Sequence, residues 1–256
     1  MSRAVRVAAE FRAAWRGFVR RPTAVFFTFF FPVLLVVIFT AFVGAGAGGL
    51  FDRGLGYYVP GYLATVVLLT PLSRVSSEVT RHREGKRFEK LAATPLSPSE
   101  WLLARTLVNC ALVLAASALI VALLFALTAG GVVPTLALLP AVALGSVLFC
   151  GVGALIGRLA DSQDGAIAAS NGIGFPLLFL SETFIPPETL PAWSRPVVAL
   201  SPLTYFSRAV RTALPDPDAG LTPATLLGTV DADVGVLAIL ALAAFAAGAS
   251  ALPWRT

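Results

Sequence analysis

Residues 78–105 read "EVTRHREGKRFEKLAATPLSPSEWLLAR", a stretch dense in ionisable side chains that lies between two long apolar runs. Only 13% of the chain is charged, whereas 57% is hydrophobic and the mean hydropathy is +0.83. A soluble domain of 256 residues cannot cover its surface with polar groups at this composition. The chain is therefore predicted to be a membrane protein, with the charged stretch outside the hydrocarbon.

Six apolar runs are long enough to cross a bilayer, which takes about 20 residues for roughly 30 Å of hydrocarbon. They are residues 24–43, 57–75, 102–127, 132–157, 165–184 and 234–252. Hydrocarbon offers no water to backbone polar groups, so the runs are predicted to be helices. The sequence lacks the alternating segments of about 10 residues that a transmembrane barrel needs. We expect one all-α integral membrane domain over residues 1–256.

The first run admits a second interpretation. A basic start and the small residues "GAGAGG" after the run imitate a secretory signal peptide. However, the apolar core of residues 24–43 is longer than the core of such a peptide. We favour a retained span.

The distribution of Lys and Arg predicts the orientation. Of 19 basic residues, six lie in the N-terminal tail and seven lie in residues 74–105, and Arg158 and Arg255 fall on the same side. The opposite side holds Arg53, Arg195, Arg208 and Arg211. Because basic loops stay in the cytoplasm, both termini and the 74–105 stretch are predicted to be cytoplasmic, in a plasma membrane. Anionic lipid is then a sufficient partner for the positive charge, and no nucleic acid is needed.

Residues 3–21 form an amphipathic pattern. Apolar side chains recur at helical spacing at Val7, Phe11, Trp15 and Phe18, with Arg on the other faces. This pattern predicts a helix lying on the inner membrane surface. The alternative is a cytoplasmic extension of the first span, against which Pro22 indicates a break.

Small residues recur along the fourth run at Ala141, Gly145, Gly153 and Gly157. Such a ridge predicts close helix packing, equally within one chain or between two copies. In the fifth run Ser170, Asn171, Gly172, Gly174 and Pro176 fall in mid-membrane. They predict a kink, which either lines a substrate route or is a packing bend.

Residues that support catalysis are scarce. The only histidine is His82, which excludes histidine-based metal clusters, and no GxxxxGK[ST] phosphate loop is present. Cys110 and Cys150 lie inside predicted spans, where no disulfide is expected. We therefore expect no catalytic residue, no cofactor and no ATP hydrolysis in this chain.

Residues 78–93 predict a helix with an apolar edge that includes Phe88 and Leu91, ended by Pro95. Exposed on a cytoplasmic loop, that edge is typical of a docking surface for a soluble partner. The alternative is a basic loop that only fixes topology.

Two segments resemble the type-2 ATP-binding-cassette (ABC) exporter permeases. Residues 83–105 resemble their first cytoplasmic loop, with a Glu-x-Gly-Thr-x-Glu-x-Leu pattern followed by a Thr-Pro-Leu turn. The matching residues are Glu84, Glu89, Leu91, Thr94, Pro95 and Leu96. Residues 174–211, "GFPLLFLSETFIPPETLPAWSRPVVALSPLTYFSRAVR", resemble the family's signature around span five.

The resemblance implies an exporter of two permease chains, most simply a homodimer, each held by a separate cytoplasmic ATPase subunit that binds ATP and Mg. Glu84–Leu91 would be the coupling helix, with Phe88 and Leu91 as apolar anchors and Glu89 as a charge contact. The N-terminal helix would be a second connector, and residues 186–214 would be re-entrant helices in the outer leaflet.

This chain departs from the family pattern at two places. Lys86 and Arg87 stand where Gly or Thr is usual, and Glu182 follows Ser181 where Gly is usual. An acid at membrane depth is a functional candidate, so Asn171, Pro176, Ser181 and Glu182 are pathway candidates. The alternative for Glu182 is snorkelling into the headgroups or pairing with Arg208 or Arg211. A self-sufficient secondary transporter is the second functional interpretation, although the inverted repeats and paired intramembrane charges typical of one are not found.

Overall fold

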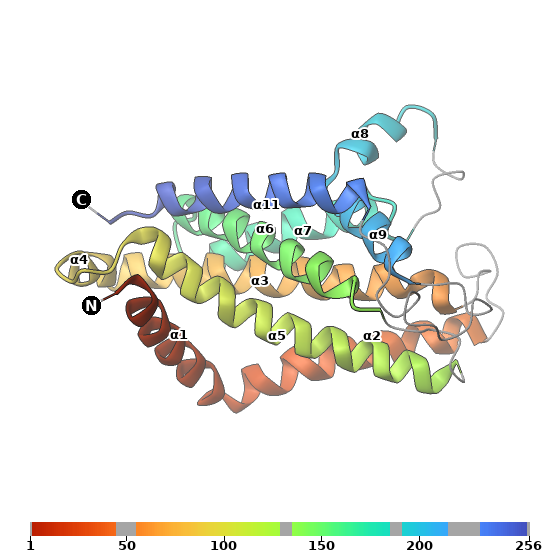
Figure 1. The fold of residues 1–256 in the computed structure, drawn as a ribbon, viewed down its shortest axis with the longest axis horizontal. Coiled ribbons are helices and arrows are strands. Elements are labelled where there is room, and N and C mark those ends of the chain that lie inside the picture. The colour runs from red at the N-terminus through yellow and green to blue at the C-terminus, as the bar shows by residue number, and fades with distance from the viewer. Residues whose placement is uncertain (1, 45–54, 129–134, 185–190, 215–230, 255–256) are drawn as a thin grey trace.

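The computed structural model describes residues 2–44, 55–128, 135–184, 191–214 and 231–254. Within these ranges every regular element is a helix (Figure 1). In chain order they are α1 (Arg3–Val19), α2 (Pro22–Gly44), the short 3₁₀ turn η2 (Leu55–Tyr58), α3 (Val59–Glu84), α4 (Arg87–Ala92), α5 (Pro98–Leu127), α6 (Leu138–Leu159), α7 (Gln163–Phe179), α8 (Arg195–Leu200), α9 (Pro202–Ala213) and α11 (Ala232–Ala251).

The long helices α3, α5, α6, α7 and α11 run along one axis, and α2 leans against them (Figure 1). The start of α1, all of α4 and the end of α11 lie at one end of this bundle, whereas α8 and α9 lie at the other. Within the described residues, four helices are long and apolar enough to cross a membrane: α2, α5, α6 and α11. The described chain is an all-helical integral membrane protein.

Several helices begin or end away from the predicted boundaries. Helix α3 continues past residue 75 to Glu84, because its polar inner end still packs against the bundle through Ser76, Val79 and Thr80, which are fully buried. Helix α7 ends at Phe179 rather than at residue 184. Just after it, the Ser181 hydroxyl donates to the carbonyl of Leu178 at 2.8 Å and ends the helix locally. The first residues of the predicted span 132–157 lie outside the described residues.

Helix α6 lies at the centre, between α3 and α11. A Cβ added to Gly153 would meet the carbonyl oxygen of Leu72 at 2.8 Å, and one added to Gly157 would clash with the carbonyl oxygen of Ser76. On the opposite face, a Cβ on Gly151 would clash with the backbone of Ala244. The small residues of α6 are thus used for packing within the chain, since only residues without side chains let two backbones approach so closely.

Polar side chains also join the helices inside the bundle. The hydroxyl groups of Ser76 on α3 and Ser170 on α7 lie 2.8 Å apart, and the Thr80 hydroxyl donates to the carbonyl of Gly157 at 3.0 Å. A Cβ on Gly174 would meet a methyl group of Leu69 at 2.8 Å. Ser170 and Gly174 therefore face α3 and serve packing.

The helix packing predicts that alanine substitution has opposite effects on stability at two glycines, Gly157 on α6 and Gly172 on α7. Gly157→Ala should destabilise the protein by about 1–3 kcal/mol, because the new methyl group must displace the α3 backbone. Gly172→Ala is the matched control: a Cβ there meets nothing within 4 Å, and Ala stabilises a helix relative to Gly by up to about 1 kcal/mol. Thermal unfolding in detergent measures both, and equal losses at the two sites would contradict this account of the packing.

Candidate functional site

The candidate site at the α4 end of the bundle is built on the break between α3 and α4. Gly85 and Lys86 connect the two helices, and Lys86 is the one non-glycine residue with a positive φ in the described chain, at 48°. This left-handed conformation costs a non-glycine residue roughly 1–2 kcal/mol. Lys86 stands at the position where the related loop pattern carries Gly. A glycine there would adopt the positive φ without strain, which explains the preference for Gly at this position.

Phe88 on α4 is buried, and the expectation that it is exposed is wrong. Only 2% of it is accessible, and its ring lies 5.5 Å from that of His82, 5.2 Å from Trp101 and 5.6 Å from Trp254. Leu91 is half-buried beside this aromatic cluster. The cluster holds α4 against α3, α5 and the segment that follows α11.

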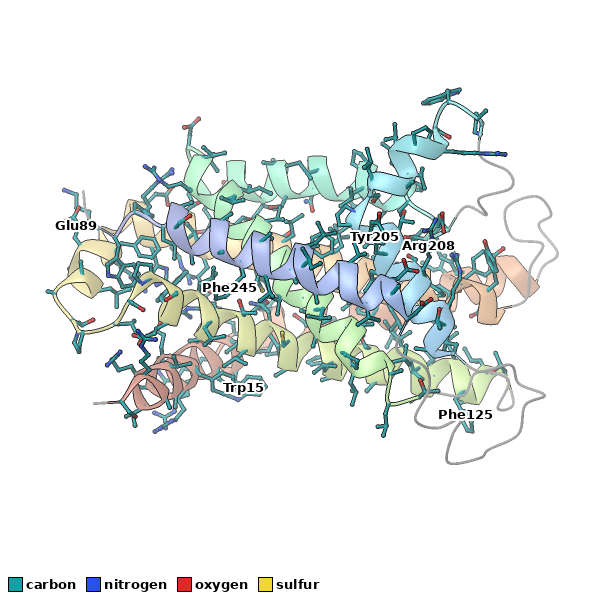
Figure 2. The ribbon with its side chains drawn as sticks, turned by 45° about the horizontal axis from the view of Figure 1, so that its top comes forward. Trp15, Glu89, Phe125, Tyr205, Arg208 and Phe245 are labelled. Carbon is teal, nitrogen blue, oxygen red and sulfur yellow. The ribbon has the colours of Figure 1, made fainter. Side chains whose placement is uncertain are left out.

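The two acids of the predicted coupling segment point outward instead. Glu84 and Glu89 are both exposed, and Glu89 lies at the end of the molecule opposite to Arg208 (Figure 2). Of the four predicted coupling residues, Glu84 and Glu89 are therefore accessible to a partner, Leu91 is partly so, and Phe88 is internal.

His82 is held in its neutral form by its surroundings. Burial and, to a smaller extent, the nearby positive charge of Arg105 lower its pKa to about 4. Its Nδ1 lies 2.8 Å from the carbonyl oxygen of Glu78, which fits a neutral ring that donates from Nδ1. The one histidine of the chain is a packing residue.

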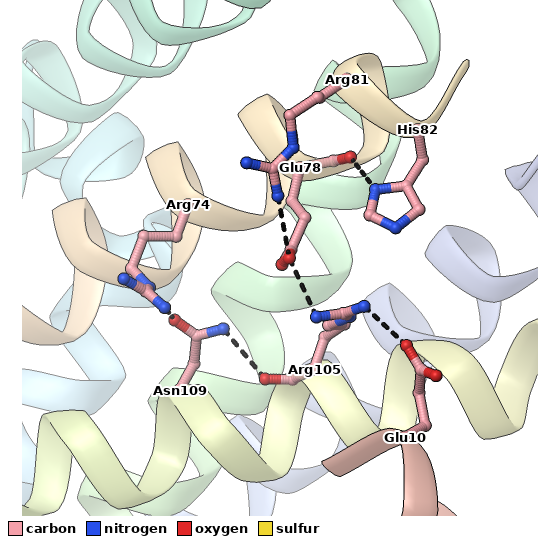
Figure 3. A network of polar contacts seen from close by, with 7 residues as sticks. All are labelled: Glu10, Arg74, Glu78, Arg81, His82, Arg105 and Asn109. Atoms are coloured by element: carbon pink, nitrogen blue, oxygen red, sulfur yellow. Dashed lines mark hydrogen bonds and ion pairs between the residues drawn. The ribbon is translucent and has the colours of Figure 1, made fainter. Parts of the chain in front are cut away.

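A charged network that the sequence interpretation missed joins α1, α3 and α5 (Figure 3). The guanidinium of Arg105 on α5 donates to Glu78 of α3 at 2.9 Å and to Glu10 of α1 at 2.6 Å. Arg81 also reaches Glu78, at 3.4 Å. The signal in the sequence was Glu10, the only acid in an otherwise basic N-terminal segment.

Glu100 makes two further contacts at this end of the bundle. Arg6 donates through Nε to Glu100 at 3.0 Å, and this hydrogen bond raises the pKa of Arg6. Glu100 also accepts from the backbone of Ser97 at 3.0 Å, completing a capping box at the start of α5. One carboxylate thus both starts α5 and holds α1.

Arg83 closes the inner end of α6. Its guanidinium donates to the carbonyl groups of Arg158 and Ala160, at the C-terminus of that helix. A cation stabilises this end of a helix, where the last carbonyls lack helical partners.

At the outer end, Glu182 is buried and paired. Arg208 on α9 donates to it through Nε at 2.8 Å, and Arg211 donates to the Glu182 carbonyl at 2.6 Å. Figure 2 shows Arg208 at the end of the bundle opposite to Glu89. The alternative interpretation of Glu182, pairing with these arginines, is confirmed.

The four pathway candidates do not come together. Ser181 lies in a buried hydroxyl chain, 2.6 Å from the Thr183 hydroxyl, which is itself 2.8 Å from that of Ser207. Asn171 and Pro176 instead lie on α7, where Asn171 is half-buried and Pro176 is exposed. No hydrogen bond of the Asn171 side chain occurs within the described residues.

Among the described residues, no group of three or more His, Cys, Asp or Glu side chains is placed to hold a metal ion, and both cysteines are free. Charged groups at both ends of the bundle connect helices, whereas Glu84 and Glu89 are exposed at the α4 end.

The class that the fold defines is a helical integral membrane protein. The chain belongs to the ABC-2 type transporter family, whose model matches residues 6–214. It is similar to the daunorubicin resistance ABC transporter permease protein DrrB1 of Streptomyces coeruleorubidus, with 24% identity over 215 residues that cover 82% of this chain and 76% of the relative. As a permease of this family, the chain is a membrane component of an ABC transporter.

The Arg105 network predicts a loss of stability in one substitution. Arg105→Gln leaves the carboxylates of Glu10 and Glu78 without their common cation, which should cost about 1–3 kcal/mol, because the two acid side chains are still 17% and 19% exposed. Hydrogen exchange should rise along α1 more than along α6. Arg12→Gln, at an exposed site on α1, is the control and should change neither the stability nor the hydrogen exchange along α1. An unaltered exchange pattern in the Arg105 variant would refute the role of the network.

The low pKa of His82 predicts a pH dependence of stability. The unfolded histidine takes up a proton near pH 6.5, whereas the folded one resists it down to about pH 4. The unfolded state therefore binds more protons in this window, and the free energy of unfolding should fall as the pH decreases from 6.5 to 4. Unfolding of the wild type and of His82→Gln at several pH values isolates the contribution of this group. Identical pH profiles would contradict it.

Proposed function

We propose that this chain is the membrane-spanning permease of an ABC exporter, which moves its substrate outward with ATP hydrolysed by a separate cytoplasmic subunit. The observation that carries the proposal is the α3–α4 corner, a rigid cytoplasmic tip that presents the acids Glu84 and Glu89. Family membership supports an ATPase partner for such a tip.

In this proposal α4 is the coupling helix, and its residues divide their roles. Glu84 and Glu89 contact basic groups of the ATPase, with Leu91 at the edge of the contact. Phe88 acts inside the permease, because its ring packs against His82 of α3 and Trp101 of α5. A displacement of α4 by the ATPase would thus move the inner ends of two long helices together.

The same corner supports a two-state mechanism. Helix α3 runs without interruption from Val59 at the outer end to Glu84 at the inner end. Packed helices shift between discrete arrangements rather than deforming smoothly. ATP-driven closure of two ATPase subunits would favour the outward-open arrangement of the spans.

We further propose six spans, adding α3 and α7 to α2, α5, α6 and α11. Helix α3 lies among them along the same axis, and α7 packs against α3. Both termini and α4 are then on the cytoplasmic side of the plasma membrane, as the basic residues indicate. Helices α8 and α9 belong to the outer leaflet, in the segment expected to be re-entrant.

A second copy of the chain on the exposed face of α7 completes the proposal. This face carries the half-buried amide of Asn171 and, one turn further along the helix, the exposed side chain of Phe175. A polar amide facing hydrocarbon without a partner is costly. A homodimer interface or a shared substrate pathway along Asn171 and Pro176 would remove that cost.

The coupling proposal predicts loss of the partner in a double charge reversal. In Glu84→Lys with Glu89→Lys, an ATPase subunit that co-purifies with the wild-type chain from native membranes should be depleted at least about tenfold, a change of about 1.4 kcal/mol. Asp164→Lys, another exposed acid, is the control and should retain it. Wild-type chain that is isolated alone and transports without ATP would support a secondary transporter instead.

The dimer proposal predicts a cross-link at one position. In a background of Cys110→Ala with Cys150→Ala, Asn171→Cys should form a disulfide-linked dimer on mild oxidation in the membrane. Leu139→Cys on α6, where the native side chain is 52% exposed, is the control and should remain monomeric. Monomers at both positions would exclude an α7-to-α7 interface.

A further inference from the structure

A groove of about 770 Å³ lies between α1, α3 and α4 at the cytoplasmic end, with the side chain of Arg105 in its lining. Six basic residues line it: Arg21, Arg74, Arg81, Arg87, Lys90 and Arg105. Two acids line it as well, Glu10 and Glu78. The groove is therefore strongly electropositive in a chain with few charges.

The two acids do not neutralise the groove. Both are ion-paired to Arg105, and Glu78 also contacts Arg81. In the described chain, none of the remaining cations, Arg21, Arg74, Arg87 and Lys90, forms an ion pair with a carboxylate. Four positive charges thus face a shared space without an anion.

The groove extends from the cytoplasm to membrane depth. Arg87 and Lys90 of α4 line its cytoplasmic part, whereas Ala24 of the apolar helix α2 lines its other part. At this deeper level the guanidinium of Arg74 lies 4.5 Å from the centroid of the Phe18 ring, and its Nε donates to Asn109 at 3.0 Å. These contacts hold Arg74 in place at the edge of the groove, beside Arg21 at the turn between α1 and α2.

We propose that this groove binds the phosphate headgroup of an anionic phospholipid of the inner leaflet. Arginine recognises phosphate through paired hydrogen bonds, and basic pockets at the cytoplasmic ends of membrane helices are suited to anionic headgroups. Arg21 and Arg74 hold the phosphate from opposite sides, one on the α1–α2 turn and one on α3. Arg87 and Lys90 add charge above it.

The depth of the groove favours a lipid over a segment of a soluble partner. The headgroup of a lipid lies at the level of Arg21, and its acyl chains would run beside α2, where Phe26 and Phe27 are exposed. The proposed ATPase contact uses the acids Glu84 and Glu89, which call for basic groups on the partner. A lipid in the groove would connect α1 to α3 from the membrane side, so bilayer composition would affect how firmly α1 is held.

Native mass spectrometry of the purified full-length chain, titrated with phosphatidylglycerol or with phosphatidylcholine, tests the site. We expect one phosphatidylglycerol to be retained in preference to phosphatidylcholine. Arg21→Gln should weaken this binding about fivefold, since one basic residue at the membrane surface contributes about 1 kcal/mol. Arg16→Gln removes the same charge from an exposed α1 position outside the groove and should leave it unchanged.

Arg74 is tested with Arg74→Lys, which keeps the charge but loses the paired hydrogen bonds. It should weaken phosphatidylglycerol binding while the thermal unfolding of the lipid-free protein stays close to the wild type. Equal retention of the two lipids, or equal loss in the Arg16 and Arg21 variants, would overturn the proposal. So would displacement of bound phosphatidylglycerol by a co-purified ATPase subunit, because the groove would then be a protein contact. The titration with lipid alone requires neither transport nor the ATPase partner.

Discussion

The close approach of backbones on both sides of α6 determines where the other helices lie. Gly153 and Gly157 admit the carbonyl groups of α3, and Gly151 admits the backbone of α11, where a Cβ on Gly248 would in turn meet the Gly151 carbonyl at 2.6 Å. Within a bilayer the hydrophobic effect does not drive helices together, so contact area and buried polar contacts must do so. A central helix with glycines on two faces supplies both neighbours with that contact. Helices α5 and α7 then pack around the α3–α6 pair.

The two ends of the bundle are fixed by different means. At the α4 end, α1 is held by ion pairs from Arg105 to Glu10 and from Arg6 to Glu100, and α4 is held by aromatic rings. At the α9 end, the pair of Glu182 and Arg208 ties α9 to the segment after α7. The α4 end therefore combines several connected elements near one accessible tip. A partner that moves α4 would act on all of them.

The sequence was sufficient to predict what depends on local patterns. The length of the apolar runs predicted a membrane protein and located its long helices approximately. The periodic apolar residues of α1 predicted its amphipathic character. The small-residue ridge indicated close packing, although only the structure shows that it is used within the chain. These features follow from composition and spacing within one helix.

Features that depend on distant residues could not be predicted. Phe88 is buried by Trp101 and Trp254, which come from separate parts of the chain. The sequence of its own loop therefore could not predict this burial. The contact between Arg105 and Glu10 joins residues 95 positions apart, and no single-segment pattern reveals such a pair. The α3 extension to Glu84 was underestimated because polar residues there still find buried partners, as Thr80 does with the Gly157 carbonyl. Glu182 was correctly linked to its arginines as one alternative, because few cations lie on that side.

The charged network also bears on how the protein is made. Arg6, Glu10, Glu100 and Arg105 all precede α6 in the chain, so both ion-paired links to α1 consist of residues synthesised before the central helix. The first part of the chain can thus hold α1 against α5 while synthesis continues. Arg83, by contrast, has its carbonyl partners only once the end of α6 has been made. Insertion of α6 would then complete an existing assembly, with α11 closing its remaining face last.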